Sequence, residues 1–202
     1  QFYFFKSINY CVHMFAFKNR YFLILENIKD IDLKNIKKRN KFSIIYRNNK
    51  KPENIIDLLR FRKICNLKDI KFYVANNLKL SVLLKADGLY LSAFNKSFKS
   101  LFLKNLNFEI IGSAHNRKEI SMKIKQGCKL ILFSKLFLVS YDKKASYLGI
   151  VKFNKFLNDN SNLIPLGGIN VSKLNFLKNI DCKGVALLSA IKKPTKIFSR
   201  LF

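Results

Sequence analysis

The chain has 202 residues with 39 basic and 12 acidic side chains, which gives a formal net charge of +27 at pH 7. Hydrophobic residues make up 49% of the sequence, and this share excludes an intrinsically disordered chain in spite of the charge. The length suits one full domain. No apolar run approaches the roughly 18 residues that a membrane-spanning helix needs, so we expect no membrane partner.

The positive charge is compositional in origin. Lys, Asn, Ile and Phe, the residues that A- and T-rich codons specify, make up nearly half of the sequence. Only seven of the basic residues are Arg, whereas phosphate and base recognition favour the bidentate Arg side chain. The basic residues are also spread over nearly every segment rather than gathered on one element. We therefore predict no nucleic-acid partner.

The cysteines and the amino-terminal segment indicate the compartment. Cys11, Cys65, Cys128 and Cys182 form no C-x-x-C pair, and the two histidines are far apart, so no zinc pattern is present. Residues 1–19 are aromatic and lack the small-residue cleavage site of a signal peptide. We expect reduced thiols, a cytoplasmic protein, and a leader or upstream extension at 1–19 ahead of one domain at 20–202.

From residue 20 onward, short apolar, β-prone runs alternate with longer stretches of helical period. The predicted strands are residues 21–25, 42–46, 71–75, 88–91, 109–112, 130–133, 163–166 and 184–187. The predicted helices are residues 33–39, 53–65, 78–85, 96–105, 117–126, 149–157, 172–179 and 190–200.

This order of elements predicts an α/β fold. Strands so apolar, each followed by a helix, favour a parallel sheet that is buried on both faces. Eight βα units in this length predict a compact (β/α)8 TIM barrel, and an open α/β sheet of seven or eight strands is the alternative. No linker, repeat or low-complexity tract divides the region, so we expect a single domain.

Two of the predicted helices have candidate apolar faces and caps. The apolar positions are Ile55, Ile56, Leu59 and Ile64 in the second helix, and Ile120, Met122 and Ile124 in the fifth. Pro52 and Glu53 are suited to open the second helix. Asn116 followed by Glu119 resembles a capping box, and Gly127 is a natural helix stop.

Small and polar residues follow the predicted strands, where the active site of a TIM barrel lies. They are Glu26, Arg47, Asn76, Ser92, Ser113, His115, Ser134, Gly167, Gly168 and Ser189. These side chains predict a polar pocket on an apolar scaffold.

The strongest local signal is P-L-G-G-I-N at 165–170, followed by G-V-A-L-L-S-A-I at 184–191. Gly167 and Gly168 allow backbone amides to approach a ligand closely, although Gly-Gly can also serve only as a tight turn. A helix that begins near Ser189 and Ala190 would point free N–H groups at the same place. Because this fold commonly binds phosphate after its seventh and eighth strands, the pair favours a phosphate site.

Taken together, residues 21–199 resemble the thiamine phosphate synthase/thiazole tautomerase family. K-A-D-G-L-Y-L at 85–91 is similar to the family's G-A-D-G-V-H-L-G-Q, and I-I-G-S-A-H-N at 110–116 is similar to I-G-x-S-T-H. F-S-K-L-F-L-V-S-Y-D at 133–142, with L-G at 148–149, is similar to its G-P-[IV]-F-P-T-x-[ST]-K loop and the L-G that follows.

The resemblance implies a transferase that joins hydroxymethylpyrimidine diphosphate to thiazole phosphate and releases diphosphate, with Mg²⁺. It implies that Arg47 contacts the diphosphate, and that Asn76 and Ser113 belong to the substrate site. The resemblance also assigns the phosphate of the thiazole partner to Gly167, Gly168, Ser189 and Ala190.

Several positions depart from the family pattern. The metal-binding acids are replaced by Asn76 and Asn95, which keep an oxygen but supply no charge, whereas Mg²⁺ prefers carboxylates and phosphates. The family Lys after the second strand is Asn49, and the family His in the fourth is Tyr90. We therefore expect an eroded metal site.

His115 is retained and supports a second interpretation. It falls where the tautomerase branch is thought to place an acid/base His, which could move a proton without a metal. A His that only caps the next helix is the simpler interpretation. The alternatives to the synthase are thus a metal-independent thiazole tautomerase and a non-catalytic barrel that binds a phosphate ligand or a regulatory partner.

Overall fold

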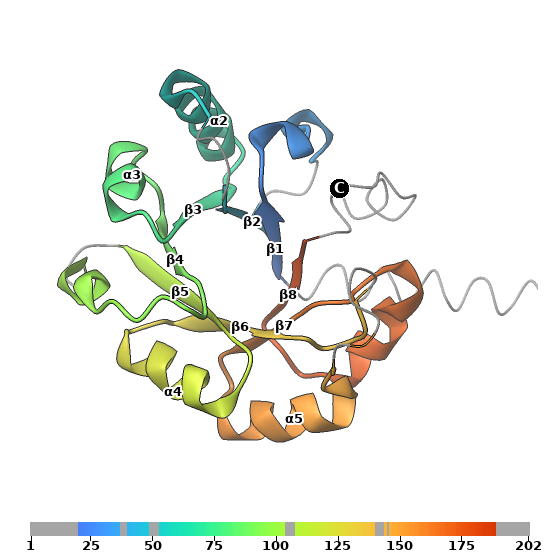
Figure 1. Ribbon diagram of the computed structural model, residues 1–202. Coiled ribbons are helices and arrows are strands. Elements are labelled where there is room, and N and C mark those ends of the chain that lie inside the picture. The colour runs from blue at the N-terminus through green and yellow to red at the C-terminus, as the bar shows by residue number, and fades with distance from the viewer. Residues whose placement is uncertain are drawn as a thin grey trace, which may run out of the picture.

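The computed structural model describes residues 20–36, 40–48, 53–103, 108–139, 144 and 146–188. Eight parallel strands close into a barrel in sequence order, and β8 pairs with β1 (Figure 1). This confirms the (β/α)8 barrel over the open sheet. The strands are β1 (Arg20–Leu25), β2 (Phe42–Tyr46), β3 (Lys71–Ala75), β4 (Gly88–Leu91), β5 (Glu109–Ala114), β6 (Leu130–Ser134), β7 (Leu163–Leu166) and β8 (Gly184–Leu187).

Helices surround the barrel in Figure 1. The α-helices are α2 (Ile55–Leu67), α3 (Leu78–Leu83), α4 (Arg117–Lys125) and α5 (Gly149–Asp159). The 3-10 segments are η1 (Ile28–Asp30), η2 (Leu33–Asn35), η3 (Lys99–Leu103) and η4 (Val171–Asn179). No helix in the described ranges is long and apolar enough to cross a membrane.

Within the predicted helices at 33–39, 96–105 and 172–179, the described residues form 3-10 segments (η2, η3 and η4) rather than α-helices. Residues 37–39 and 104–105 lie outside the described part of the chain. At two of these segments a short polar cap starts the tight turn: Asp32 accepts from the N–H of Lys34, and Asn170 accepts from the N–H of Lys173. The predicted helix at 190–200 and the predicted leader at 1–19 lie outside the described residues.

The strands are buried on both faces, as their apolar composition predicts. Alternate residues of β1 face opposite ways: Tyr21 and Leu23 pack with the outer cluster, whereas Phe22 and Ile24 pack with the inner one. The inner cluster fills the barrel with Phe22, Ile24, Ile45, Tyr73, Tyr90, Ile111, Leu130, Leu132, Ile164 and Ala186. The barrel is therefore a packed core rather than a pore.

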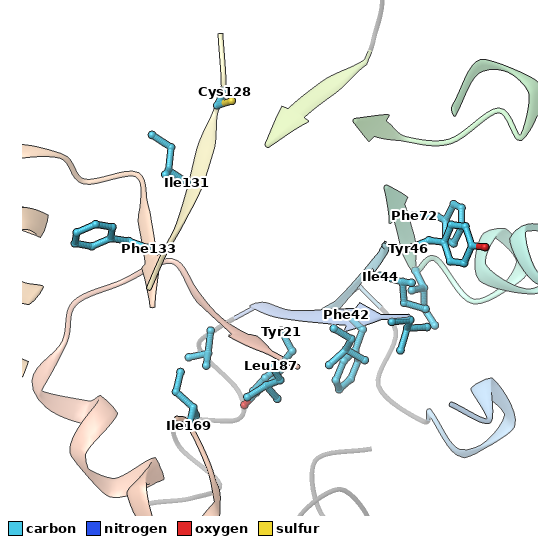
Figure 2. Packing of buried hydrophobic residues seen from close by; sticks show 14 of the residues in the cluster. Tyr21, Phe42, Ile44, Tyr46, Phe72, Cys128, Ile131, Phe133, Ile169 and Leu187 are labelled. Carbon is cyan, nitrogen blue, oxygen red and sulfur yellow. The ribbon is translucent and has the colours of Figure 1, made fainter. Parts of the chain in front are cut away.

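The outer cluster lies between the strands and the helices. Figure 2 shows Tyr46 of β2 beside Phe72 of β3, with ring centroids 6.3 Å apart and stacked planes. Phe61 of α2 meets the edge of Phe72 at a centroid distance of 6.0 Å. Such aromatic contacts fix how α2 sits on the barrel.

The predicted apolar face of α2 is wrong as a core face. Ile56 is 52% exposed and Leu59 is 43% exposed, while the helix buries Leu58, Phe61, Arg62 and Cys65. Arg62 can be buried because its guanidinium donates to the carbonyl of Lys85 and lies 3.1 Å from a carboxylate oxygen of Asp87. The helix also begins at Ile55 after an Asn54 cap, two residues later than predicted.

The Asn116 cap and the Gly127 stop predicted for α4 are confirmed, but the capping box is incomplete because Glu119 accepts from the N–H of His115. The predicted apolar face is only partly right. Asn116 accepts from the N–H of Glu119 at 2.9 Å, and Gly127 adopts φ +80 just past the helix. Ile120 is buried, but Ile124 is 52% exposed. The buried face is completed by Lys123, which is not part of the predicted apolar face.

Candidate functional site

A pocket of about 190 Å³ opens at the carboxyl ends of the strands. Its lining includes seven of the residues predicted to form the pocket: Arg47, Ser92, Ser113, His115, Ser134, Gly167 and Gly168. The pocket suits a small molecule rather than a macromolecule. It is also lined by Tyr90, Ala93, Phe94, Lys135, Val139, Leu166, Ile169, Ala186, Leu187 and Leu188.

Arg47 follows β2, and its backbone N–H donates to the carbonyl of Leu25 at 2.8 Å. A carboxylate oxygen of Glu26 is 3.9 Å from its Nη2, which is too far for a strong ion pair. The Nε atom of Arg47 is buried and has no hydrogen-bond acceptor in the described part of the chain. A guanidinium held in this way is suited to receive an anion.

Tyr90 of β4 and Ser113 of β5 lie deep in the pocket, where Tyr90 is 1% exposed. Burial raises the pKa of Tyr90, and a hydrogen bond with Ser113 and the nearby charge of Arg47 only partly oppose that effect. The phenol therefore stays protonated, and it can donate to a ligand but not act as a base at neutral pH.

His115 follows β5 and is paired with Glu119 of α4. Its Nδ1 lies 3.0 Å from a carboxylate oxygen of Glu119, and its backbone N–H donates to the same oxygen at 2.7 Å. Burial raises the pKa of Glu119, but hydrogen bonds from His115 and Asn116 outweigh burial and lower it overall. The ionised carboxylate can only accept, so Nδ1 carries a proton and Nε2 is left as the free ring nitrogen.

The Gly-Gly turn after β7 joins the loop after β6. Gly167 and Gly168 both have positive φ, at +95 and +67. The carbonyl of Gly167 accepts from the N–H of Phe137 at 3.0 Å, and a Cβ on Gly168 would lie 2.5 Å from the carbonyl oxygens of Phe137 and Leu138. Glycine is required here because the two loops pack backbone against backbone.

The same turn offers backbone donors. Gly168 and Ile169 line the pocket, and their N–H groups have no hydrogen-bond acceptor among the described residues. Free amides at the seventh strand are a usual phosphate-binding feature of this fold. The predicted partners Ser189 and Ala190 lie outside the described residues.

Asn76 and Asn95, the predicted metal positions, do not line the pocket; they bind each other beside Ser92 of its lining, and we call this group the rim. Asn95 Nδ2 donates to Asn76 Oδ1 at 3.0 Å, and the same oxygen accepts from the N–H of Ser92 at 3.0 Å. Asn95 Oδ1 accepts from the N–H of Ser97 at 2.9 Å. Both side-chain oxygens are neutral and already engaged, so these residues do not fit Mg²⁺.

Two buried side chains, one in α4 and one at its C-terminal cap, support this rim from behind. Lys123 and Gln126 are both fully buried. Lys123 Nζ donates to the carbonyl of Asn95 at 2.8 Å and to Gln126 Oε1 at 2.9 Å. Gln126 Nε2 donates to the carbonyls of Asn95 and Ser97 at 2.9 and 2.8 Å. The loop from Ser92 to Ser97 is thus anchored to the outer helix.

Sequence reasoning missed Lys135 in the pocket lining and Glu119 as the partner of His115. The spacing of four between His115 and Glu119 was an available signal, because such a pair meets within one helical turn. Lys135 gave no signal, since it is one of many lysines in the sequence.

The closed barrel defines a (β/α)8-barrel protein, with a pocket of small-molecule size at the carboxyl ends of its strands. Comparison with protein families then gives a match to thiamine monophosphate synthase over residues 22–191. The chain belongs to this family.

Curated relatives carry the same name. The thiamine-phosphate synthase of Prochlorococcus marinus (strain MED4) is 28% identical over 141 residues, which cover 69% of this chain and 40% of that protein. That of Persephonella marina is 28% identical over 139 residues, which cover 67% of this chain and 66% of that protein. The chain therefore matches less than half the length of the Prochlorococcus relative.

Solved structures share the fold. A thiamine phosphate pyrophosphorylase from Pyrococcus furiosus aligns with a TM-score of 0.71 at 17% identity, covering 91% of this chain and 93% of that one. KGPDC from Streptococcus mutans aligns with a TM-score of 0.59 at 9% identity, covering 91% and 95%. Because barrels with other names align almost as fully, the fold alone does not assign the reaction.

Proposed function

We propose that this protein is a transferase of thiamine biosynthesis that joins hydroxymethylpyrimidine diphosphate to thiazole phosphate. The C–O bond to diphosphate breaks and its electron pair leaves with diphosphate, while the thiazole nitrogen supplies the pair for the new C–N bond. Family membership supports the reaction class. The cytoplasm remains the expected compartment.

The observation that carries this proposal is Arg47, whose buried Nε lacks an acceptor among the described residues, in one pocket with the Gly167–Gly168 turn. A guanidinium can stabilise the charge that develops on the departing diphosphate. Amides at the Gly-Gly turn can hold the phosphate of the thiazole partner, with Ser113 and the protonated Tyr90 as donors to the substrates between them.

The test is formation of thiamine phosphate from both substrates by the purified chain. Arg47→Ala should lower kcat/KM at least about a hundredfold, because it removes a charge-stabilising donor. Arg60→Ala, on the exposed face of α2, is the matched control and should change nothing. Thiazole phosphate binding without any turnover would instead favour a non-catalytic barrel.

A second candidate, thiazole tautomerase, is favoured by the His115–Glu119 pair. A carboxylate that fixes the imidazole leaves its Nε2 able to accept and return a proton. His115→Asn should then stop isomerisation of thiazole phosphate while calorimetry shows unchanged phosphate affinity.

A further inference from the structure

The charges of the pocket-lining residues are unexpected, because the family resemblance implies Mg²⁺. Among the described lining residues, Arg47 and Lys135 are cationic, and none is Asp or Glu. A divalent cation is attracted by carboxylates and repelled by fixed cations, whereas a phosphorylated ligand is attracted by the same cations. The lining thus favours an anion that arrives without a metal.

Both amide oxygens of the rim already accept hydrogen bonds. Asn76 Oδ1 accepts two hydrogen bonds, and Asn95 Oδ1 accepts one from Ser97. Asn76 also holds φ +55, a left-handed conformation that Asn tolerates, and its N–H donates to the carbonyl of Tyr90 at 2.8 Å. A metal here would have to break this network and would gain only neutral amide oxygens.

The rim also needs no metal to keep its shape. The Lys123 ammonium and the Gln126 amide converge on the carbonyls of Asn95 and Ser97 from inside the protein. The Lys123 stem occupies space over β5, since a Cβ on Gly112 would lie 2.9 Å from its Cδ. The buried Lys123 ammonium therefore holds the loop from Ser92 to Ser97 in place, so that no bound metal ion is needed for this purpose.

We propose that the pocket binds its phosphorylated ligand as the metal-free anion, with protein cations and backbone amides in place of a divalent ion. Arg47 and Lys135 supply the charge, and Gly168 and Ile169 supply N–H donors. This inference rests on the proposed function, because it concerns the same phosphate-binding pocket.

The test is calorimetric titration of the full chain with inorganic pyrophosphate, in EDTA and again with saturating MgCl2. Because Mg²⁺ complexes pyrophosphate and lowers the concentration of the metal-free anion, we expect total pyrophosphate to bind at least about threefold more weakly in MgCl2 than in EDTA. An affinity that is equal or tighter in MgCl2 would overturn the inference and leave the proposed function standing. Absence of pyrophosphate binding in both buffers would overturn the proposed function, and this inference with it.

A double variant tests the charge argument separately. Asn76→Asp with Asn95→Asp adds two negative charges at the rim, and Asp tolerates the left-handed conformation of residue 76. In EDTA this variant should bind pyrophosphate at least about tenfold more weakly, and Mg²⁺ should restore the affinity. Circular dichroism melts check that it folds. Equal affinity of variant and wild type in EDTA would contradict the charge argument.

Discussion

The ammonium of Lys123 lies 2.8 Å from the carbonyl oxygen of Asn95, although one residue belongs to α4 and the other to the loop after β4. Gln126 donates to the same carbonyl at 2.9 Å. These two buried side chains join an outer helix to the rim of the pocket, and their energetic coupling can be measured.

We expect Lys123→Met and Gln126→Leu each to lower the free energy of unfolding by about 1–3 kcal/mol, because each leaves buried polar groups without a partner. The double variant should lose less than the sum, since the bond between the two side chains is removed once. Urea unfolding of the four proteins gives the cycle. Strict additivity would show that the two residues act separately.

The register of α2 gives a second prediction, from two adjacent leucines. Leu58 is 1% exposed and Leu59 is 43% exposed. Leu58→Ala should lower the free energy of unfolding by about 2–5 kcal/mol through loss of core packing. Leu59→Ala should change it by less than about 0.5 kcal/mol. Chemical denaturation compares the two, and a larger loss for Leu59→Ala would reverse the assigned faces.

The strands could be predicted from the sequence because burial on both faces makes each one a continuous apolar run. The same argument fails for α2, where apolar residues lie on more than one side and no single stripe stands out. Arg62 is buried because the carbonyl of Lys85 and the carboxylate of Asp87, both more than 20 residues away, accept from its guanidinium. A partner so distant in sequence leaves no local signal.

The candidate site, like the fold, could be predicted only in part from the sequence. Residues that follow strands, such as Arg47 and Gly168, must gather at one end of a barrel, so topology alone brings them together. The Lys123 side chain can point inward because Gly112 has no side chain to fill that space. The carbonyl of Asn95, in another loop, then accepts its hydrogen bond. Composition obscured this arrangement, because lysine is abundant and usually exposed.

The Gly-Gly turn gives a third prediction, with Gly149 as its matched control. Both Gly149 and Gly168 have positive φ, but a Cβ on Gly149 would meet nothing within 4 Å. Gly149→Ala should cost about 1 kcal/mol of folding free energy, from backbone strain alone. Gly168→Ala should cost about 2–4 kcal/mol, because its Cβ meets two carbonyl oxygens. Thermal melts measure both, and equal costs would count against the backbone contact.

The buried thiols give a prediction on pH. Burial raises the pKa of Cys65 and of Cys128 to about 12, and that of Cys182 to about 11. The native protein should therefore resist iodoacetamide at these three positions at pH 8, while the unfolded chain reacts readily. Peptide mapping by mass spectrometry measures each position, and rapid native labelling at any one of them would contradict its burial.

The same shifts predict how stability changes in alkaline solution. In the unfolded chain thiols ionise near pH 8.5, below their folded-state pKa values, so the unfolded state loses protons first. The contribution of these thiols to the free energy of unfolding should be complete below that pH and should decline above it. Replacing Cys65 with Ala should flatten this decline in denaturant titrations at pH 8 to 10.

The last prediction concerns the tautomer of His115. The lowered pKa of Glu119 keeps its carboxylate ionised at neutral pH, so Nδ1 of His115 must donate. Long-range ¹H–¹⁵N spectra should therefore show the Nδ1–H form of neutral His115, assigned by loss of its signals in His115→Asn. Glu119→Ala removes the acceptor for Nδ1–H and should give a mixture of the two tautomers. Lys118→Ala, at the neighbouring position, removes no hydrogen bond to the imidazole and should leave the spectrum unchanged. An Nε2–H tautomer in the wild type would mean that Nε2 cannot take up a proton from the ligand, and would remove the basis for proton transfer by this residue.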